Sequence, residues 1–255
     1  MLAEGSEALP VLYRDDWLIA VHKPAGLLVH RSALDRHETR FALQMLRDQI
    51  GRPVYPAHRL DKGTSGVLLF ALDREVGRAL AARFEGGEVE KRYLAVVRGH
   101  PPEAGVVDHA LAPLADDHAG LASGRPRTAV TRYRRLARVE LPHRVDRYPT
   151  SRYALVELLP STGRRHQLRR HMKHIAHPII GDTTHGHGAH NRMFRERFGC
   201  SRLLLVAVGM CLRHPSTDLP LAIETHPDED FLQVTGAAGL LPRSAIWKAH
   251  SAAIP

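Results

Sequence analysis

Short apolar segments with strand character outnumber the helical segments of this sequence, and the two kinds do not alternate regularly along the chain. A doubly wound parallel sheet requires regular alternation, because each strand is followed by a helix that crosses over the sheet. The pattern therefore favours an α+β fold. The ranges expected to form strands are 11–13, 17–21, 27–29, 67–72, 93–97, 128–133, 153–159, 203–208 and 221–223.

Helices are expected where apolar residues recur with helical spacing or where a capping residue marks a boundary. Gly51 follows one periodic stretch and predicts its end, and Asp73 is a residue type that caps helix N-termini. The expected helices are 41–50, a segment that starts after Asp73, 165–174, and a segment around 230–234. The segments expected to be loops are 55–66, 115–126 and 182–198.

The size and composition of the chain exclude several classes of protein. A length of 255 residues, 44% of them hydrophobic and 25% charged, suffices for one large core and rules out disordered and collagen-like chains. The longest apolar run, 203–212, has about half the length of a membrane-spanning helix. Cys200 and Cys211 cannot form a disulfide framework, and no signal peptide is visible. We therefore expect a cytoplasmic protein that does not bind membranes, folded as a single domain over residues 1–255.

Positive charge is concentrated in one part of the chain. The segment 125–200 contains 17 basic and 5 acidic residues, whereas the remainder of the chain has a net charge of −3. Sixteen of these basic residues are arginines, whose guanidinium groups bind phosphate through paired hydrogen bonds and stack on bases. A coding preference for arginine would explain the ratio of arginine to lysine but not the clustering. The charge distribution therefore favours a nucleic acid as the partner.

The most concentrated polar stretch, HRLDKGTSG at 58–66, precedes the apolar strand expected from Val67. Asp61 lies among basic side chains in this stretch, and nearby positive charge favours a carboxylate that acts as nucleophile or base. A structural ion pair at the start of a strand is the alternative interpretation. The spacing does not fit a nucleophile elbow, a β-lactamase motif or a phosphate-binding P-loop.

A second stretch, TGRRHQLRRH at 162–171, combines a turn with the start of a basic helix. Arg165 and Arg169 are four residues apart, as are His166 and Arg170, so two cationic stripes would lie side by side on the helix. Phosphate would bind both the free N–H groups at the helix start and the guanidinium groups. A helix face that is merely exposed to solvent is the alternative interpretation.

Seven histidines lie between positions 166 and 190, which raises the question of a metal site. The sequence has no HExxH motif, and its two cysteines are not spaced as a zinc pair. Asp182 is the only acidic residue between Thr162 and Arg195, so carboxylate ligands are scarce in this segment. We therefore expect no metal site and interpret these histidines as surface and helix residues that contact phosphate.

Four stretches of the sequence resemble, in the right order, the motifs of the RluA-type pseudouridine synthase family. They are KPAG at 23–26 with Val29 and His30, HRLD and TSG within 58–66, KRY at 91–93, and TGR with HQLR at 162–169 followed by HPIIGD at 177–182. Together they cover roughly residues 11–225. The stretches 29–32, 47–51 and 147–150 resemble the branch that modifies uridine 65 of tRNA more than the rRNA branches. Val206 stands where many members have a histidine that is not expected to be catalytic.

The resemblance implies a fold and a reaction. The implied fold is an α+β catalytic domain with a central, mostly antiparallel mixed sheet, flanking helices and a cleft between two halves. Because the chain begins directly with the first expected strand, we expect it to lack the small N-terminal RNA-binding module that some members carry. The implied reaction converts uridine in RNA to pseudouridine, and because no electrons or atoms are exchanged, no cofactor is expected. We expect a monomer whose substrate is tRNA or, alternatively, rRNA.

The family also implies roles for individual residues. Asp61 corresponds to the essential nucleophile, which attacks either C1′ of the ribose or C6 of the uracil. Arg164 would pair with Asp61, and Tyr93 would stack on the flipped uracil and serve as a base. Arg59 would fill the space that the base leaves in the RNA. The residues expected to bind RNA are His58, Arg59, Arg165, Arg169 and Arg170.

Two other classes of function are weighed against an RNA isomerase. A catalytically decayed RNA-binding protein of the same fold would share the positive charge, but it would not require Asp61, Tyr93 and Arg164 to be kept. A metal-dependent hydrolase or nuclease would use the histidines between 166 and 190 as ligands.

Overall fold

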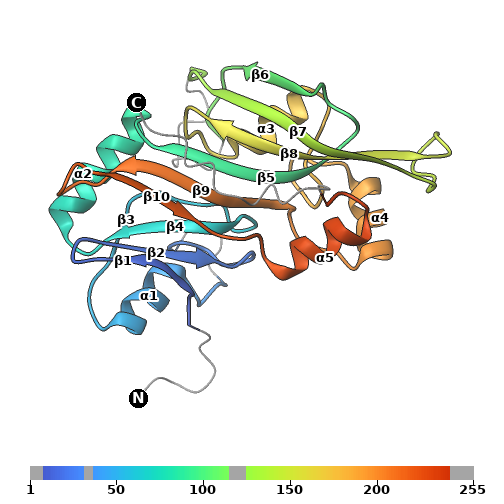
Figure 1. Cartoon of the computed structure of the whole chain (residues 1–255). Coiled ribbons are helices and arrows are strands. Elements are labelled where there is room, and N and C mark those ends of the chain that lie inside the picture. The colour runs from blue at the N-terminus through green and yellow to red at the C-terminus, as the bar shows by residue number, and fades with distance from the viewer. Residues whose placement is uncertain (1–7, 32–36, 115–124, 242–255) are drawn as a thin grey trace. The chain divides into compact units, whose positions relative to one another are not determined.

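A computed structural model of the chain describes residues 8–31, 37–114 and 125–241 (Figure 1). The chain divides into two compact units. In the described ranges, the first unit comprises the residues up to Glu90 together with 207–226, and the second comprises the rest. The loop expected at 115–126 lies almost entirely outside the described residues.

The first unit is built on antiparallel strands. Its described part contains six strands: β1 (Val11–Arg14), β2 (Leu18–Lys23), β3 (Tyr55–Pro56), β4 (Ser65–Ala71), β9 (Leu205–Arg213) and β10 (Pro220–Glu224). Their hydrogen-bonded order is β1-β2-β4-β9, and β10 pairs with β9 while β3 pairs with β4. The pairs β1–β2, β2–β4, β3–β4 and β9–β10 are antiparallel. The loop that carries Asp61 lies between β3 and β4.

Two helices accompany these strands, α1 (Ala42–Ile50) and α2 (Arg74–Gly86). The Asp73 side chain caps α2 as expected, because it accepts hydrogen bonds from the backbone N–H groups of its first turn. All seven residues of β4 are buried, and Leu80 of α2 packs into the same apolar cluster as Leu69 of β4. The strand that follows the Asp61 loop is therefore the centre of this unit's core.

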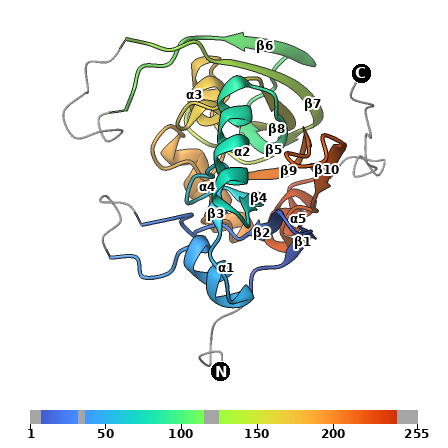
Figure 2. The same ribbon diagram turned by 90° about the vertical axis from the view of Figure 1, so that its left-hand side faces the viewer.

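The second unit also contains an antiparallel set of strands, hydrogen-bonded in the order β5-β8-β7-β6. The four strands are β5 (Glu90–Arg98), β6 (Ala104–Asp108), β7 (Val130–Leu141) and β8 (Ser151–Pro160). Its helices are α3 (Gln167–His174), α4 (Gly188–Phe198) and α5 (Glu229–Ala237). Both views place α3 beside β7 and β8 (Figures 1 and 2), and Leu168 and Met172 of α3 pack with Ala154 and Val156 of β8.

Most of the expected elements are present, and four differ from the expectation. The segment 55–66 was expected to be a loop, but its first two residues form β3. The range 27–29 forms only a single bridge, between Leu28 and Phe41, instead of a strand. The segment 182–198 was expected to be a loop, but its second half is α4, whose Met193 and Phe194 are buried. The strand β6 was not expected, because its sequence AGVVD carries little apolar alternation. Tertiary packing, rather than local composition, accounts for α4.

Candidate active site

The Asp61 loop is a tight, ordered turn at the start of β4. The backbone N–H of Thr64 donates to the carbonyl oxygen of Asp61 at 3.0 Å, and the Asp61 side chain is half-buried. Gly66 has φ +107°, and a Cβ at this position would lie 2.0 Å from the carbonyl oxygen of Ala207. Glycine is therefore required on both conformational and steric grounds, and β4 begins in close contact with β9.

Lys23, at the end of β2, connects the KPAG turn to the Asp61 loop. Its side chain is fully buried, and its Nζ donates to the carbonyl oxygens of Pro24 at 2.9 Å, Leu27 at 2.7 Å and Lys62 at 3.3 Å. The N–H of Gly26 donates to the same Lys62 oxygen at 2.8 Å. Sequence reasoning assigned no role to Lys23, because nothing local in the motif indicates that this lysine is buried.

His58 occupies a structural position in the same loop. Its Nε2 accepts a hydrogen bond from the N–H of Leu69 at 3.1 Å, and its ring stacks on Phe84 of α2 at a centroid distance of 4.6 Å. Arg59, the next residue, is exposed. Partial burial together with the charge of Arg59 lowers the pKa of His30, so these two side chains lie near each other. Of His58 and Arg59, only Arg59 is exposed to solvent.

Tyr93 lies in β5, directly opposite Leu158 of β8 in the strand register. Its ring is partly buried and packs against the apolar cluster of the second unit. A ring supported in this way on one side has a fixed orientation, which suits a surface for stacking a base.

Gln167 organises the loop that carries Arg164. Its buried Oε1 accepts hydrogen bonds from the Thr162 hydroxyl at 2.7 Å and from the N–H of Arg164 at 2.9 Å. Its Nε2 donates to the carbonyl oxygen of Val130 at 3.0 Å and to the hydroxyl of Thr131 at 3.1 Å. The TGR turn is thereby fixed to β7, while the Arg164 side chain is exposed and donates to the carbonyl oxygen of Thr128 at 3.2 Å.

Arg169 differs from its two neighbours in the basic stretch because it is buried. Its Nε and Nη2 each donate to one carboxylate oxygen of Asp182 at 2.8 Å, and only 8% of the residue is exposed. Burial by itself raises the pKa of Asp182, but the hydrogen bond and charge of Arg169, with the N–H groups of His185 and Thr184, hold it below its usual value. Arg165 and Arg170 are half-buried, and Arg170 Nη1 donates to the carbonyl oxygen of Ala112 at 2.8 Å.

Three of the seven histidines between positions 166 and 190 connect elements of the second unit. His171 of α3 is fully buried between the hydroxyl of Thr131 at 2.9 Å and the carbonyl oxygen of His109 at 3.0 Å. Burial lowers its pKa. His166 Nδ1 lies 2.9 Å from His185 Nε2, which links the start of α3 to the segment after Asp182.

The expected site residues therefore fall into two sets. His58, Arg59 and Asp61 share one loop of the first unit, whereas Tyr93, Arg164, Arg165, Arg169 and Arg170 belong to the second unit. The pairing of Asp61 with Arg164 remains a prediction. Across the three described ranges, no helix combines the length and apolar character needed to cross a membrane.

Comparison with known proteins finds several chains that are about half identical to this one. The chain is 51% identical over 224 residues to tRNA pseudouridine synthase C of Vibrio cholerae serotype O1, which covers 87% of this chain and 92% of that protein. The proteins of the same name from Pasteurella multocida (strain Pm70) and Yersinia pestis are 51% and 49% identical over 229 and 240 residues. These matches cover 89% and 92% of this chain and 94% and 93% of the relatives.

Two solved human structures have a similar fold. Human RNA Pseudouridylate Synthase Domain Containing 4 matches with a TM-score of 0.68 and 26% identity, covering 91% of this chain and 94% of that chain. Human RNA Pseudouridylate Synthase Domain Containing 1 matches with a TM-score of 0.67 and 26% identity, covering 89% and 86%. The expected α+β fold is thereby confirmed. Residues 17–174 match the RNA pseudouridylate synthase family, and this chain belongs to that family.

Proposed function

We propose that this chain is a tRNA pseudouridine synthase that isomerises uridine 65, with Asp61 as its nucleophile. The observation that carries the proposal is the identity of 49–51%, over 87–92% of the chain, with relatives named tRNA pseudouridine synthase C. The stretches 29–32, 47–51 and 147–150, which resemble the branch specific for uridine 65, support the choice of position. An rRNA substrate is the alternative.

The proposed reaction is an isomerisation. The bond between N1 of the uracil and C1′ of the ribose breaks, the base turns, and C5 bonds to C1′. The proton on C5 leaves and N1 takes one up, so the product has the composition of the substrate. No electrons are transferred to or from the RNA, and the reaction therefore requires no cofactor.

Asp61 would supply the carboxylate that attacks either C1′ or C6 and holds one fragment while the base turns. The loop around it supports this role, because a nucleophile must be held within reach of one atom of the substrate. The N–H of Thr64 donates a hydrogen bond to the carbonyl oxygen of Asp61. The next carbonyl oxygen, that of Lys62, accepts hydrogen bonds from Lys23 and Gly26, so the backbone of the loop is held at two consecutive residues.

Tyr93 and Arg164 would complete the site. We infer that the Tyr93 ring stacks on the flipped uracil and that its hydroxyl takes the C5 proton. Arg164 would pair with Asp61 through its guanidinium, which is exposed at the end of a loop that Gln167 holds in place. Arg59 would occupy the space in the RNA that the base leaves.

The phosphate contacts would come from Arg165, which lies just before α3, and from Arg170 in the helix itself. For Arg169 and His58, the geometry supports a positioning role in place of the expected RNA contact. The Arg169 guanidinium binds the buried carboxylate of Asp182, and the His58 ring lies between Leu69 and Phe84. Each stabilises a loop that presents other residues.

We further propose that the enzyme acts as a monomer in the cytoplasm, where a tRNA substrate is available. Light scattering on protein eluting from a size-exclusion column, with and without tRNA, tests the oligomeric state. A mass of two or more chains at working concentration would contradict the monomer.

The decisive experiment is tritium release from tRNA transcripts labelled at C5 of uridine, with EDTA present throughout. We expect release by the wild type and by Asp48→Asn, a matched control at an exposed aspartate of α1, and none by Asp61→Asn. Mapping the modified nucleotide tests the position. Substantial turnover by Asp61→Asn would show that the nucleophile is misassigned, and release from rRNA but not tRNA would favour the alternative substrate. RNA binding without release from any transcript would favour a decayed synthase.

A further inference from the structure

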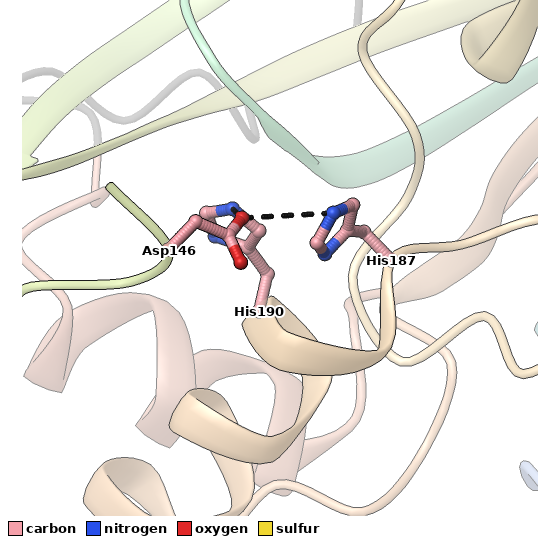
Figure 3. Close-up of side chains that lie close together, drawn as sticks. All are labelled: Asp146, His187 and His190. Atoms are coloured by element: carbon pink, nitrogen blue, oxygen red, sulfur yellow. Dashed lines mark ion pairs between the residues drawn. The ribbon is translucent and has the colours of Figure 1, made fainter. Parts of the chain in front are cut away.

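A cluster of three potential metal ligands lies in the second unit, formed by Asp146, His187 and His190 (Figure 3). Each residue contributes one ligand atom, and these atoms lie within 4.8 Å of one another. Figure 3 shows the Asp146 side chain, which comes from one segment, close to the rings of His187 and His190, which both come from the start of α4. None of the three residues belongs to the proposed catalytic or RNA-binding set.

The backbone fixes the positions of all three residues. Asp146 lies in the tight turn between β7 and β8 that the bridge between Val145 and Tyr148 closes, and its φ is +59°. Aspartate is one of the few residues that tolerate this left-handed conformation. His187 is the N-cap residue of α4, and His190 lies three residues later, so the two rings lie on the same side of the helix start.

The distances favour a shared ion over direct hydrogen bonds. Asp146 Oδ2 lies 3.6 Å from His187 Nε2 and 3.7 Å from His190 Nε2. Both separations exceed the length of an ordinary hydrogen bond. Ligand atoms around a tetrahedral zinc ion, at bond lengths near 2.0–2.1 Å, are about 3.4 Å apart. The two separations from Asp146 are therefore within a few tenths of an ångström of this spacing, and all three ligand atoms lie within 4.8 Å of one another.

The surroundings of His190 are those of a ligand held by a second residue. His190 is 5% exposed, and its Nδ1 lies 2.7 Å from the hydroxyl of Tyr153, which is fully buried. This hydrogen bond orients the ring so that Nε2 points toward Asp146, in the way that outer residues orient metal-binding histidines. Burial, together with the charge of Arg98, lowers the pKa of His190 to about 4, so the imidazole is neutral at physiological pH.

We propose that Asp146, His187 and His190 bind one divalent transition-metal ion of the zinc class. Two imidazoles with one carboxylate suit zinc, cobalt or nickel, whereas magnesium and calcium prefer oxygen ligands. Three protein ligands leave a fourth tetrahedral position for water or an exogenous ligand. The ion would join the β7–β8 turn to the first turn of α4, two segments about forty residues apart in the chain.

Two features of the site limit its affinity. The Arg98 charge acts on His190, and the N-terminus of α4 carries a partial positive charge, so both oppose a bound cation. The Asp146 carboxylate compensates for part of this repulsion. We therefore expect a dissociation constant in the micromolar range, weaker than that of a closed structural zinc site.

No metal site was expected from the sequence, because Asp182 is the only acidic residue among the histidines at 166–190. The ligand that completes the cluster, Asp146, precedes the first of those seven histidines by twenty positions. Only the folding of β7 and β8 into adjacent strands brings this turn to the start of α4. No short motif carries this information.

Cobalt and zinc binding to the untagged full-length chain tests the proposal. After treatment with EDTA and its removal, we expect one equivalent of Co²⁺ to produce the visible absorption of a tetrahedral site and Zn²⁺ to displace it. Asp146→Asn and His187→Ala should each weaken binding by about tenfold or more. His187 is 39% exposed in its side chain, so its replacement should leave the fold intact, as circular dichroism can verify.

His143→Ala is the matched control, because this histidine lies near the same turn but outside the cluster, and it should leave the affinity unchanged. The proposal is wrong if the wild type gives no tetrahedral cobalt spectrum. It is also wrong if the double variant Asp146→Asn/His187→Ala binds cobalt as tightly as the wild type, since the remaining histidines would then account for binding. Neither result would affect the proposed isomerase, which is assayed in EDTA.

Discussion

The buried ammonium group of Lys23 donates a hydrogen bond to the carbonyl oxygen of Lys62, 39 residues later and directly after Asp61. The KPAG turn and the loop of the proposed nucleophile are therefore one structural element, although they belong to separate motifs in the sequence. Of the three carbonyl oxygens that Lys23 binds, that of Pro24 lies in the turn, that of Leu27 directly follows it, and that of Lys62 lies in the loop. The position of Asp61 thus depends on a residue that would not touch the RNA.

Replacing Lys23 with methionine should destabilise the protein and reduce turnover. The methionine fills a similar volume but leaves buried carbonyl oxygens without a donor, which costs about 1–3 kcal/mol in the free energy of unfolding. Urea unfolding and tritium release measure the two effects. Lys62→Met is the control, because the Lys62 side chain forms an exposed ion pair with Glu38, worth at most about 1 kcal/mol. Equal stability of the two variants would contradict the assigned role of Lys23.

Gly66→Ala should be among the most destabilising single-methyl additions in the chain. The new Cβ would lie 2.0 Å from the carbonyl oxygen of Ala207, and φ of +107° is unfavourable for any other residue. Backbone strain and steric displacement together should lower the free energy of unfolding by about 2–5 kcal/mol. Gly163→Ala should cost little, since nothing lies within 4 Å of a Cβ there. Thermal unfolding of both variants provides the test, and a stable Gly66→Ala protein would refute the close contact of β4 with β9.

The sequence predicted local features of the fold well. The cap at Asp73, the helix end at Gly51 and the buried strand after the Asp61 loop each depend on residues within a few positions, and all three are present. The helix α4 was missed because its glycine- and histidine-rich start lacks a side-chain cap and its stability comes from buried Met193 and Phe194. Local composition could not reveal which side chains find partners in the core.

The candidate site shows the same limit. Asp61 and the TGR turn were recognisable as motifs, but the burial of Lys23 and Arg169 depends on partners 39 and 13 residues away. A helical spacing of four placed Arg165 and Arg169 on one stripe, whereas the structure buries Arg169 at the Asp182 carboxylate. The observed helix also begins only at Gln167, so Arg165 and Arg169 do not share a helix face, because Arg165 precedes the helix.

Asp182→Asn should remove a pH-dependent part of the stability. The pKa of Asp182 in the folded protein is held below the usual aspartate value of 3.8, so its ionised form favours folding. This contribution is present above pH 3.8 and is lost as the pH falls through the lowered pKa of the folded state. At neutral pH the variant should be less stable by about 3–5 kcal/mol, because the buried Arg169 charge loses its partner.

Urea unfolding of wild type and Asp182→Asn, from neutral pH to below pH 3.8, checks this expectation. The difference between the two proteins should shrink as the pH falls. Asp15 and Asp73 also have lowered pKa values, but they contribute equally to both proteins and cancel in the difference. If the difference in the free energy of unfolding stays constant down to the lowest pH measured, the charge of the Asp182 carboxylate is not what stabilises this loop.

Arg165→Gln and Arg170→Gln should each weaken tRNA binding and reduce its dependence on salt. If each guanidinium contacts one phosphate, removing it lowers the slope of log K against log salt by about one. Because phosphate contacts carry no sequence information, the loss should be similar for tRNAs of different sequence. Fluorescence anisotropy with labelled tRNA at several salt concentrations measures the slope.

The control is Arg47→Gln. Arg47 is an exposed arginine of α1 that pairs with Asp48 and lies outside the basic segment 125–200, so the slope of this variant should equal that of the wild type. Unchanged slopes for both test variants would remove α3 from the RNA-binding surface, and the excess positive charge of 125–200 would then have to act through its other arginines.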